Sequence, residues 1–237
     1  MLRAIFIEGR CMWSSVLGLV ALAVLGWRLV HVFRRKQKQK AKATEFLFAD
    51  VLAVIEKPVF EQRGADGFPR MSGTYRGYPV QIYPLVDTLA TRRLPALWLL
   101  VTLQDKLPVK AHFDLMMRPA GPTTFSNFDH LPHTLDPQEG FPEQAVIRTD
   151  NVEDVLPASL VKPHLESFFG QRAKELLITE NGVRIVWLLA EAERARYGVL
   201  RQAEFGEVQI EGQLARDILD RLIAIRKDIL DWSTERT

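Results

Sequence analysis

The sequence predicts an α+β protein in which an N-terminal transmembrane helix precedes a cytoplasmic domain, with a mainly antiparallel sheet packed by two or three helices. Three observations predict this class. Residues 11–27 form an uncharged run, short runs of strand character follow one another between residues 70 and 117, and an apolar stripe repeats along residues 211–232. The chain has 237 residues, of which 47% are hydrophobic, and this is enough for one sizeable core.

Residues 11–33 are predicted to form the transmembrane helix. The uncharged run is followed by Arg28 and five mostly apolar residues. About 20 residues are therefore available to cross a hydrocarbon layer of ~30 Å if Arg28 extends its side chain to the headgroups. A cleaved signal peptide would need a small-residue cleavage site after the apolar run, and we find none. A core helix would ordinarily carry polar residues on one face.

Basic residues beside this helix predict its orientation. No acidic residue occurs from 11 to 42, and Arg3 and Arg10 are the cations that precede the run. Because Lys and Arg are retained on the cytoplasmic side, we expect residues 1–10 to be extracytoplasmic and the domain to lie in the cytoplasm, below a bacterial inner membrane crossed once. The cations expected at the membrane surface are Arg28, Arg34, Arg35, Lys36, Lys38, Lys40 and Lys42. Either Met1 or Met12 could be the start; the anchor is predicted in both cases.

Residues 34–57 are predicted to continue the membrane helix as a basic neck. Apolar residues between Phe46 and Ile55 recur at approximately helical spacing, and Pro58 marks the end of this pattern. The cytoplasmic domain is accordingly expected to cover residues 58–237.

Four strands are predicted at the start of this domain, over residues 70–75, 78–85, 96–103 and 111–117. Arg76-Gly77 and Asp105-Lys106 are the expected reversals between them. Most connections are too short for a crossover helix, which favours an antiparallel meander. Residues 118–143 are rich in Pro, Gly, Ser, Thr and His, and we expect a long loop there that is functional or mobile.

The C-terminal half is predicted to contain a short strand at 145–148, a helix over 159–169, a hairpin and a terminal helix. The hairpin is expected at Asn181-Gly182, because both residues accept the positive φ of a type I′ turn. The terminal helix over 211–232 should pack on the sheet through a stripe of apolar residues, namely Leu214, Ile218, Leu222, Ile225 and Ile229.

Charge and motifs exclude several functions. Residues 43–237 carry 22 cations and 28 anions, a balance that disfavours nucleic acid as a partner. The sequence lacks the glycine-rich phosphate loops, the GxSxG elbow and the HExxH motif, and its single cysteine, Cys11, cannot form a multi-thiolate zinc site. We therefore expect no cofactor, and the sequence favours a non-enzymatic role without naming a reaction.

One group of residues suggests metal binding. Asp129, His130 and His133 occur together in NFDHLPH, and His112 and Asp114 lie on the strand before this loop and face the same side. Imidazole and carboxylate ligands suit zinc or another divalent ion. Pro132 prevents an ordinary helical presentation of the two histidines, and no pattern supplies a fourth ligand. A loop that is merely polar is the simpler interpretation.

The order of features after the anchor resembles that of uncharacterised bacterial single-pass membrane-anchored proteins. The segments concerned are GTYRGYPV from Gly73, VIRTDN at 146–151, the ENGVRI hairpin and the terminal amphipathic helix. The resemblance implies an inner-membrane setting and an α+β fold, and it implies no site residue.

Two functional hypotheses follow. The first is a non-enzymatic membrane-anchored interaction module, such as a subunit or assembly factor of a membrane complex, with a protein partner in or at the membrane. The second is a metal-dependent enzyme or ligand sensor that uses the region of His112, His130 and His133.

Overall fold

The computed structural model describes residues 26–28, 30–31, 45–61, 68–87, 89, 94–136, 138–194, 203 and 205–235. These residues fall into two compact units, Met1–Glu45 and Phe46–Thr237. In the first unit, residues 26–28 and 30–31 are helical.

The predicted membrane segment lies almost wholly outside the described residues. Of the seven cations expected at the membrane surface, Arg28 is described and the others, from Arg34 to Lys42, are not. Across the described parts of the chain, no helix combines the length and the apolar character needed to span a bilayer. The anchor at 11–33 and the extracytoplasmic residues 1–10 stay predictions from the sequence.

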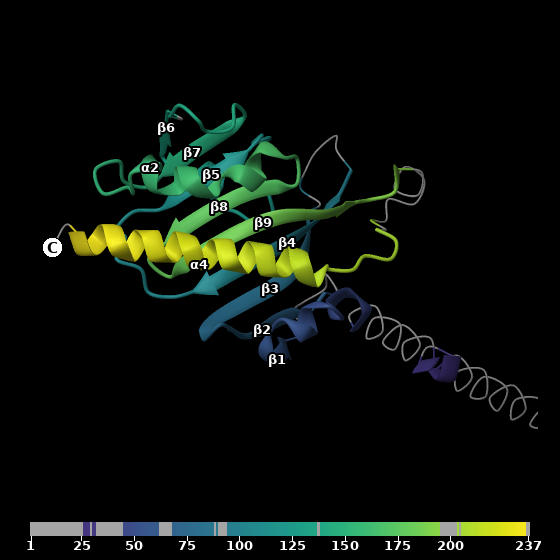
Figure 1. The fold of residues 1–237 in the computed structure, drawn as a ribbon. Helices are drawn as coiled ribbons and strands as arrows, with labels where there is room; N and C mark the ends of the chain where they lie inside the picture. Colours follow the sequence, from purple (N-terminus) through teal and green to yellow (C-terminus); the bar gives the residue numbers. More distant parts are fainter. Residues whose placement is uncertain are drawn as a thin grey trace, which may run out of the picture. The chain divides into compact units, whose positions relative to one another are not determined.

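The second unit is a nine-strand antiparallel sheet with a long C-terminal helix, α4, lying across it (Figure 1), which confirms the α+β class. The strands are β1 (Glu56–Glu61), β2 (Arg70–Tyr75), β3 (Tyr78–Asp87), β4 (Ala96–Gln104), β5 (Phe113–Met117), β6 (His133–Leu135), β7 (Ala145–Thr149), β8 (Ala173–Thr179) and β9 (Gly182–Glu191). The helical segments are η1 (Val51–Ala53), η2 (Phe128–His130), α2 (Ala158–Val161), η3 (Lys162–His164), η4 (Glu166–Phe169) and α4 (Gly212–Glu235).

The strand order is β1-β2-β3-β4-β9-β8-β5-β7-β6, so the β8–β9 hairpin lies between β4 and β5. The predicted meander is correct from β2 to β4 and wrong at the next step, because β4 pairs with β9 instead of β5. The turn at Asp105-Lys106 does not close a hairpin. The backbone N–H groups of Asp105 and Leu107 donate to carbonyl groups of the β8–β9 loop, over 3.3 and 2.9 Å. After β4 the chain therefore runs along the end of the β8–β9 hairpin.

The main core lies between the sheet and α4. The predicted stripe is confirmed: Ile218, Leu222, Ile225 and Ile229 are all buried, and Leu214 packs against the core from its margin. Acidic and basic residues of α4 form hydrogen bonds and ion pairs with residues of other elements. Asp220, for example, accepts hydrogen bonds from the Tyr75 hydroxyl over 2.9 Å and from Arg76 over 3.2 Å.

Two predicted helices take other forms. The helix expected to run to Lys57 ends at Phe48, and β1 starts at Glu56. Of the apolar residues that suggested a helical stripe, Val51 and Ile55 are buried in the main core through a tight turn, whereas Phe46 and Leu52 are exposed. The helix expected over 159–169 is divided into α2, η3 and η4, because Pro163 lacks the N–H that a continuous helix needs.

The β8–β9 hairpin is confirmed, but its turn lies one residue earlier than expected. Thr179 pairs with Gly182, so Glu180 and Asn181 form the loop. Gly182 has φ +139°, and a Cβ at this position would overlap the carbonyl oxygen of Leu103 on β4. Paired positive φ values occur instead in the β2–β3 turn, at Arg76 (48°) and Gly77 (85°), as a type I′ turn requires.

Candidate functional site

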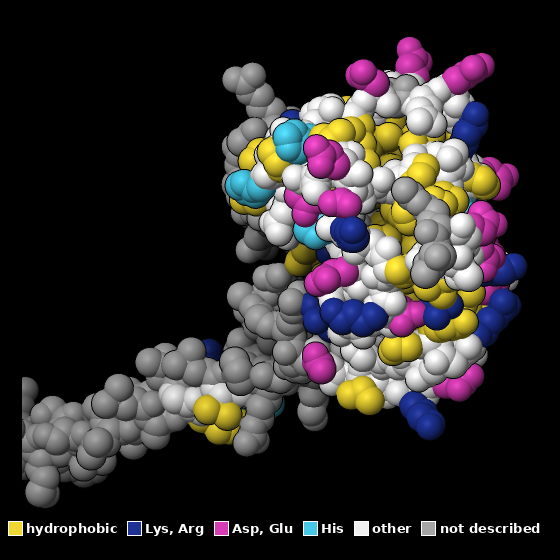
Figure 2. Space-filling view, turned by 90° about the vertical axis from the view of Figure 1, so that its left-hand side faces the viewer, with side chains coloured by type: hydrophobic (Ala, Val, Ile, Leu, Met, Phe, Trp, Pro, Cys, Tyr) yellow, Lys and Arg dark blue, Asp and Glu magenta, His cyan; other side chains and the backbone are white. Residues whose placement is uncertain are grey.

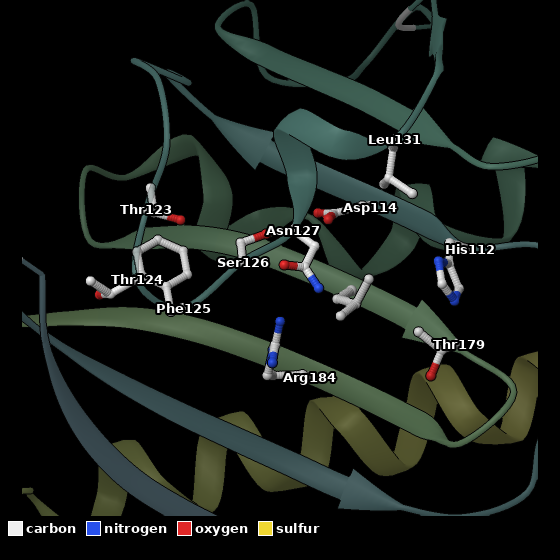
Figure 3. A pocket seen from close by; sticks show the side chains of 11 residues that line it. His112, Asp114, Thr123, Thr124, Phe125, Ser126, Asn127, Leu131, Thr179 and Arg184 are labelled. Carbon is white, nitrogen blue, oxygen red and sulfur yellow. The ribbon is translucent and has the colours of Figure 1, made fainter. Parts of the chain in front are cut away.

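A cavity of about 300 Å³ lies on the sheet face that points away from α4 (Figure 3). Residues Thr123–Leu131, here called the strap, cross this face, and several of their side chains line one side of the cavity. His112, just before β5, and Asp114 on β5 also line it. Strand alternation accounts for the two faces. Phe113, Leu115 and Met117 pack in the main core, whereas Met116 belongs to a smaller apolar cluster under the strap.

Sheet residues hold the strap at several points. The ring of Phe125 lies 5.4 Å from that of Trp98, centroid to centroid. Arg148 on β7 donates hydrogen bonds to the carbonyl oxygens of Phe128 and Asp129, over 3.3 and 3.1 Å, and its guanidinium lies over the Phe128 ring. The strap is therefore a packed part of the domain, although the sequence predicted only a loop.

Three ionisable side chains converge below the strap. In the register of the sheet, Asp114 on β5 is opposite Leu177 on β8, and Leu177 is opposite Arg184 on β9. Glu175 lies two residues from Leu177 and on the same face. Arg184 donates to the Glu175 carboxylate over 3.2 Å. Asp114 is 2% exposed and Glu175 is completely buried.

Burial determines the protonation of this group. It raises the pKa of Asp114 to about 9, and the charge of Glu175 adds to this effect, whereas Arg184 and a hydrogen bond with Ser126 oppose it. Burial also raises the pKa of Glu175, against the attraction of Arg184. Arg184 contacts Glu175 and so favours the charged form of that carboxyl group, whereas Asp114, with a pKa of about 9, is a neutral acid at pH 7.

Three atoms in this group have no hydrogen-bond partner among the described residues: Oδ1 of Asp114, Oε1 of Glu175 and Nε of Arg184. Buried carboxyl oxygens are normally satisfied, so the two carboxyl oxygens mark a place where a bound group would find a ready partner. Asp114 is the one of the two that lines the cavity.

The residues singled out for metal binding are distributed over the domain. His112 and Asp114 line the same cavity, as their spacing predicted. His112 is turned toward Asp150, with 3.4 Å between Nδ1 and Oδ2. Asp129, His130 and His133 are exposed, on η2 and the edge strand β6. Nowhere in the described parts of the chain do three His, Cys, Asp or Glu side chains converge to hold a metal ion.

Sequence reasoning missed Glu175, Arg184 and Ser126. A signal for the first two was present, since both are charged residues in strand sequences, AKELLIT and GVRIVWLL, that are largely apolar apart from Lys174. Two opposite charges at inward positions of one hairpin predict a buried pair. Nothing local distinguished Ser126 from the other hydroxyl residues of the strap.

Comparison with known proteins gives one distant structural likeness. No family model and no curated protein matches the sequence. The fold is similar to the crystal structure of the mycobacterial trehalose monomycolate transport factor A, TtfA, with a TM-score of 0.39 and 12% sequence identity. The match covers 77% of this chain and 95% of the mycobacterial chain.

Proposed function

We propose that the chain is a non-enzymatic accessory module anchored in the bacterial inner membrane by residues 11–33, with a domain that binds a protein partner in or at the membrane. One observation carries the proposal of a binding domain. The sheet face opposite α4 bears aromatic and arginine side chains that no described helix covers.

This helix-free face is formed by β2, β3, β4 and β9, beside the strap. Arg70, Tyr83 and Trp98 are all half-buried there, and the Arg70 guanidinium lies 4.6 Å from the centre of the Tyr83 ring. Aromatic residues and arginine are enriched in the centres of protein interfaces, because they combine a large contact area with directed polar groups. The sequence predicts a functional or mobile loop at residues 118–143, and the strap is the part of that segment that lies beside this face.

The surface of the domain carries both signs of charge. Figure 2 shows acidic and basic side chains interspersed on one side of the domain, with hydrophobic side chains exposed between them. Such a mixed surface suits a protein partner better than a polyanion, which requires a field of one sign.

Site-specific photo-crosslinking in native membranes tests the proposal. A photoreactive phenylalanine analogue at Trp98 or Gln81, both on the helix-free face, should give crosslinks to one partner protein. The same analogue at Lys227, on the exposed side of α4, should not. Equal crosslinking at both faces would exclude the helix-free face as the specific surface.

Anchoring is tested separately. Deletion of residues 34–44, or release of the domain from the membrane, should abolish function in cells while the domain remains folded, because a partner at the membrane is met only by an anchored domain. If the released domain fully restores the phenotype of a deletion strain, position at the membrane is not required and the proposal is wrong.

A further inference from the structure

Hydroxyl side chains are the most frequent polar groups in the lining of the cavity under the strap. Hydroxyl groups come from the strap and from β8, and an amide comes from Asn127 (Figure 3). The hydroxyl residues are Thr123, Thr124, Ser126 and Thr179. Hydroxyl and amide groups both donate and accept hydrogen bonds. A ligand whose own groups do both would match them.

Asp114 gives this lining a point of attachment. Asp114 is only 2% exposed, it lines the cavity, and its Oδ1 has no partner among the described residues. An unsatisfied buried polar atom costs about 1–3 kcal/mol, and a bound molecule that supplies a hydrogen bond recovers that cost.

The charged groups around the cavity have partners, with two donors left over. Arg184 is paired with Glu175 through Nη2, whereas the Nε atoms of Arg184 and Arg148 have no partner among the described residues. His112 lies beside Asp150. Arg148, which faces Asp114 from β7, is bound to two strap carbonyl groups. An anionic ligand would place a second acidic group beside the buried Glu175 that Arg184 already pairs with, and a cationic ligand would have to displace the proton of Asp114 beside a guanidinium. A neutral ligand requires neither change, and its oxygen atoms can accept from Nε of Arg184.

We propose that this cavity binds a small neutral molecule rich in hydroxyl groups, with Asp114 as its central hydrogen-bonding residue. The volume of about 300 Å³ lies at the lower end of the range for small-molecule sites and suits a molecule the size of a single sugar ring or a cyclitol. Phe125, Leu131 and Leu177 supply the apolar part of the lining, which can contact the C–H faces of such a ring.

This site is independent of the proposed partner surface. Ligand binding in the cavity needs neither the membrane nor a second protein. A negative result for the ligand would therefore not contradict the accessory-module proposal, and a negative result for the partner would not contradict the ligand proposal.

Ligand-observed NMR with a charge series on one ring tests the proposal. The full chain is held in phospholipid nanodiscs, because detergents with sugar headgroups would compete. Glucose and myo-inositol should bind, whereas glucosamine and glucuronate, which add a positive and a negative charge to the same ring, should bind about tenfold more weakly or worse. Equal or tighter binding of either charged compound, or no binding of the neutral ones, would overturn the proposal.

Variants of Asp114 locate the binding to this cavity. Asp114→Asn keeps a neutral group of the same shape and should retain binding, whereas Asp114→Ala should weaken it by about tenfold. Wild-type binding should decline above pH 9, because the pKa of Asp114 is about 9 and its ionised carboxylate can no longer donate a hydrogen bond, and Asp114→Asn should not share the decline. The ionisable groups that face Asp114 are Glu175, Arg184, Arg148 and His112.

Lys227→Ala, on the far side of the sheet, is the matched control and should bind like wild type. Thermal unfolding of each variant shows whether it is folded. A folded Asp114→Ala variant that binds like wild type would exclude Asp114 as the central residue.

Discussion

Arg184 on β9 donates a hydrogen bond to the completely buried carboxylate of Glu175 on β8, over 3.2 Å. Removing one partner of a buried ion pair leaves an uncompensated charge. Arg184→Met should therefore reduce the free energy of unfolding by about 3–5 kcal/mol, as measured by urea denaturation. The double variant Glu175→Leu/Arg184→Met should lose much less than the sum of the two single losses. Additive losses would show that the two side chains are not coupled.

Asp114→Asn should change how stability depends on pH. The folded-state pKa of Asp114 is raised to about 9 from an ordinary 3.8, so folding favours its neutral form. The stability that this preference contributes is fully present below pH 3.8 and is lost progressively as the pH rises to about 9. Asparagine has no such loss. The unfolding free energy of the variant relative to wild type should therefore increase between pH 4 and pH 9, and parallel curves would show that Asp114 titrates normally.

Gly182→Ala should be much more destabilising than Gly77→Ala. Both glycines have positive φ, which costs an L-residue about 1–2 kcal/mol. A methyl group at Gly77 meets no atom within 4 Å, whereas at Gly182 it overlaps the Leu103 carbonyl group in the centre of the sheet. The second substitution should add about 1–3 kcal/mol to the first cost, because β4 and β9 must move apart. Equal losses in denaturant unfolding would contradict this close approach.

Truncation of the α4 stripe tests the main core. Ile218→Ala and Leu222→Ala should each reduce the free energy of unfolding by about 2–5 kcal/mol, since both side chains are buried against the sheet. Lys227→Ala on the exposed side of the same helix is the control and should stay within about 0.5 kcal/mol of wild type. A loss below ~1 kcal/mol at Ile218 would place the stripe at a partner interface.

The predicted topology can be tested by reporter fusion. An enzyme reporter that is active only in the cytoplasm should be active when fused after Lys42 and also after Thr237, because cations are concentrated on the C-terminal side of the predicted membrane helix. Activity of a periplasm-only reporter at either position would show the opposite orientation.

Local features of the fold could be predicted from the sequence, whereas long-range pairings could not. Strand periodicity located β2, β3, β4 and β7 almost to the residue, and the α4 stripe was identified by its spacing alone. Each of these depends on neighbours within a few residues. The insertion of β8–β9 between β4 and β5 depends on which strand edges fit together, and turn residues such as Asp105 do not encode that choice.

Residues before Pro58 show how one pattern can satisfy two structures. Val51 and Ile55 are spaced as in a helix, yet the chain turns at Val51–Ala53 and buries both beside β2. Phe46 and Leu52, which belong to the same pattern, are exposed. Periodicity therefore identified only part of the buried set, and it predicted the wrong backbone conformation.

The sequence predicted part of the candidate site. His112 and Asp114 were singled out because residues two apart on a strand share a face, and both do line the cavity. Their partners come from β8 and β9, some sixty to seventy residues further along the chain, and only the completed sheet brings them to Asp114. The exposed histidines of the strap and β6 were named as candidate metal ligands from their side-chain chemistry, but the fold does not bring them together.

The central place of the β8–β9 hairpin has a consequence for biosynthesis. Strands β4 and β5 have no neighbour on their facing edges until residues up to 191 have been made, and the core is open until α4 follows. The domain therefore has a high contact order and should fold slowly, after translation has ended. A nascent chain that stops before the hairpin would carry two partial sheets with exposed edges, which are prone to aggregation and to recognition by chaperones.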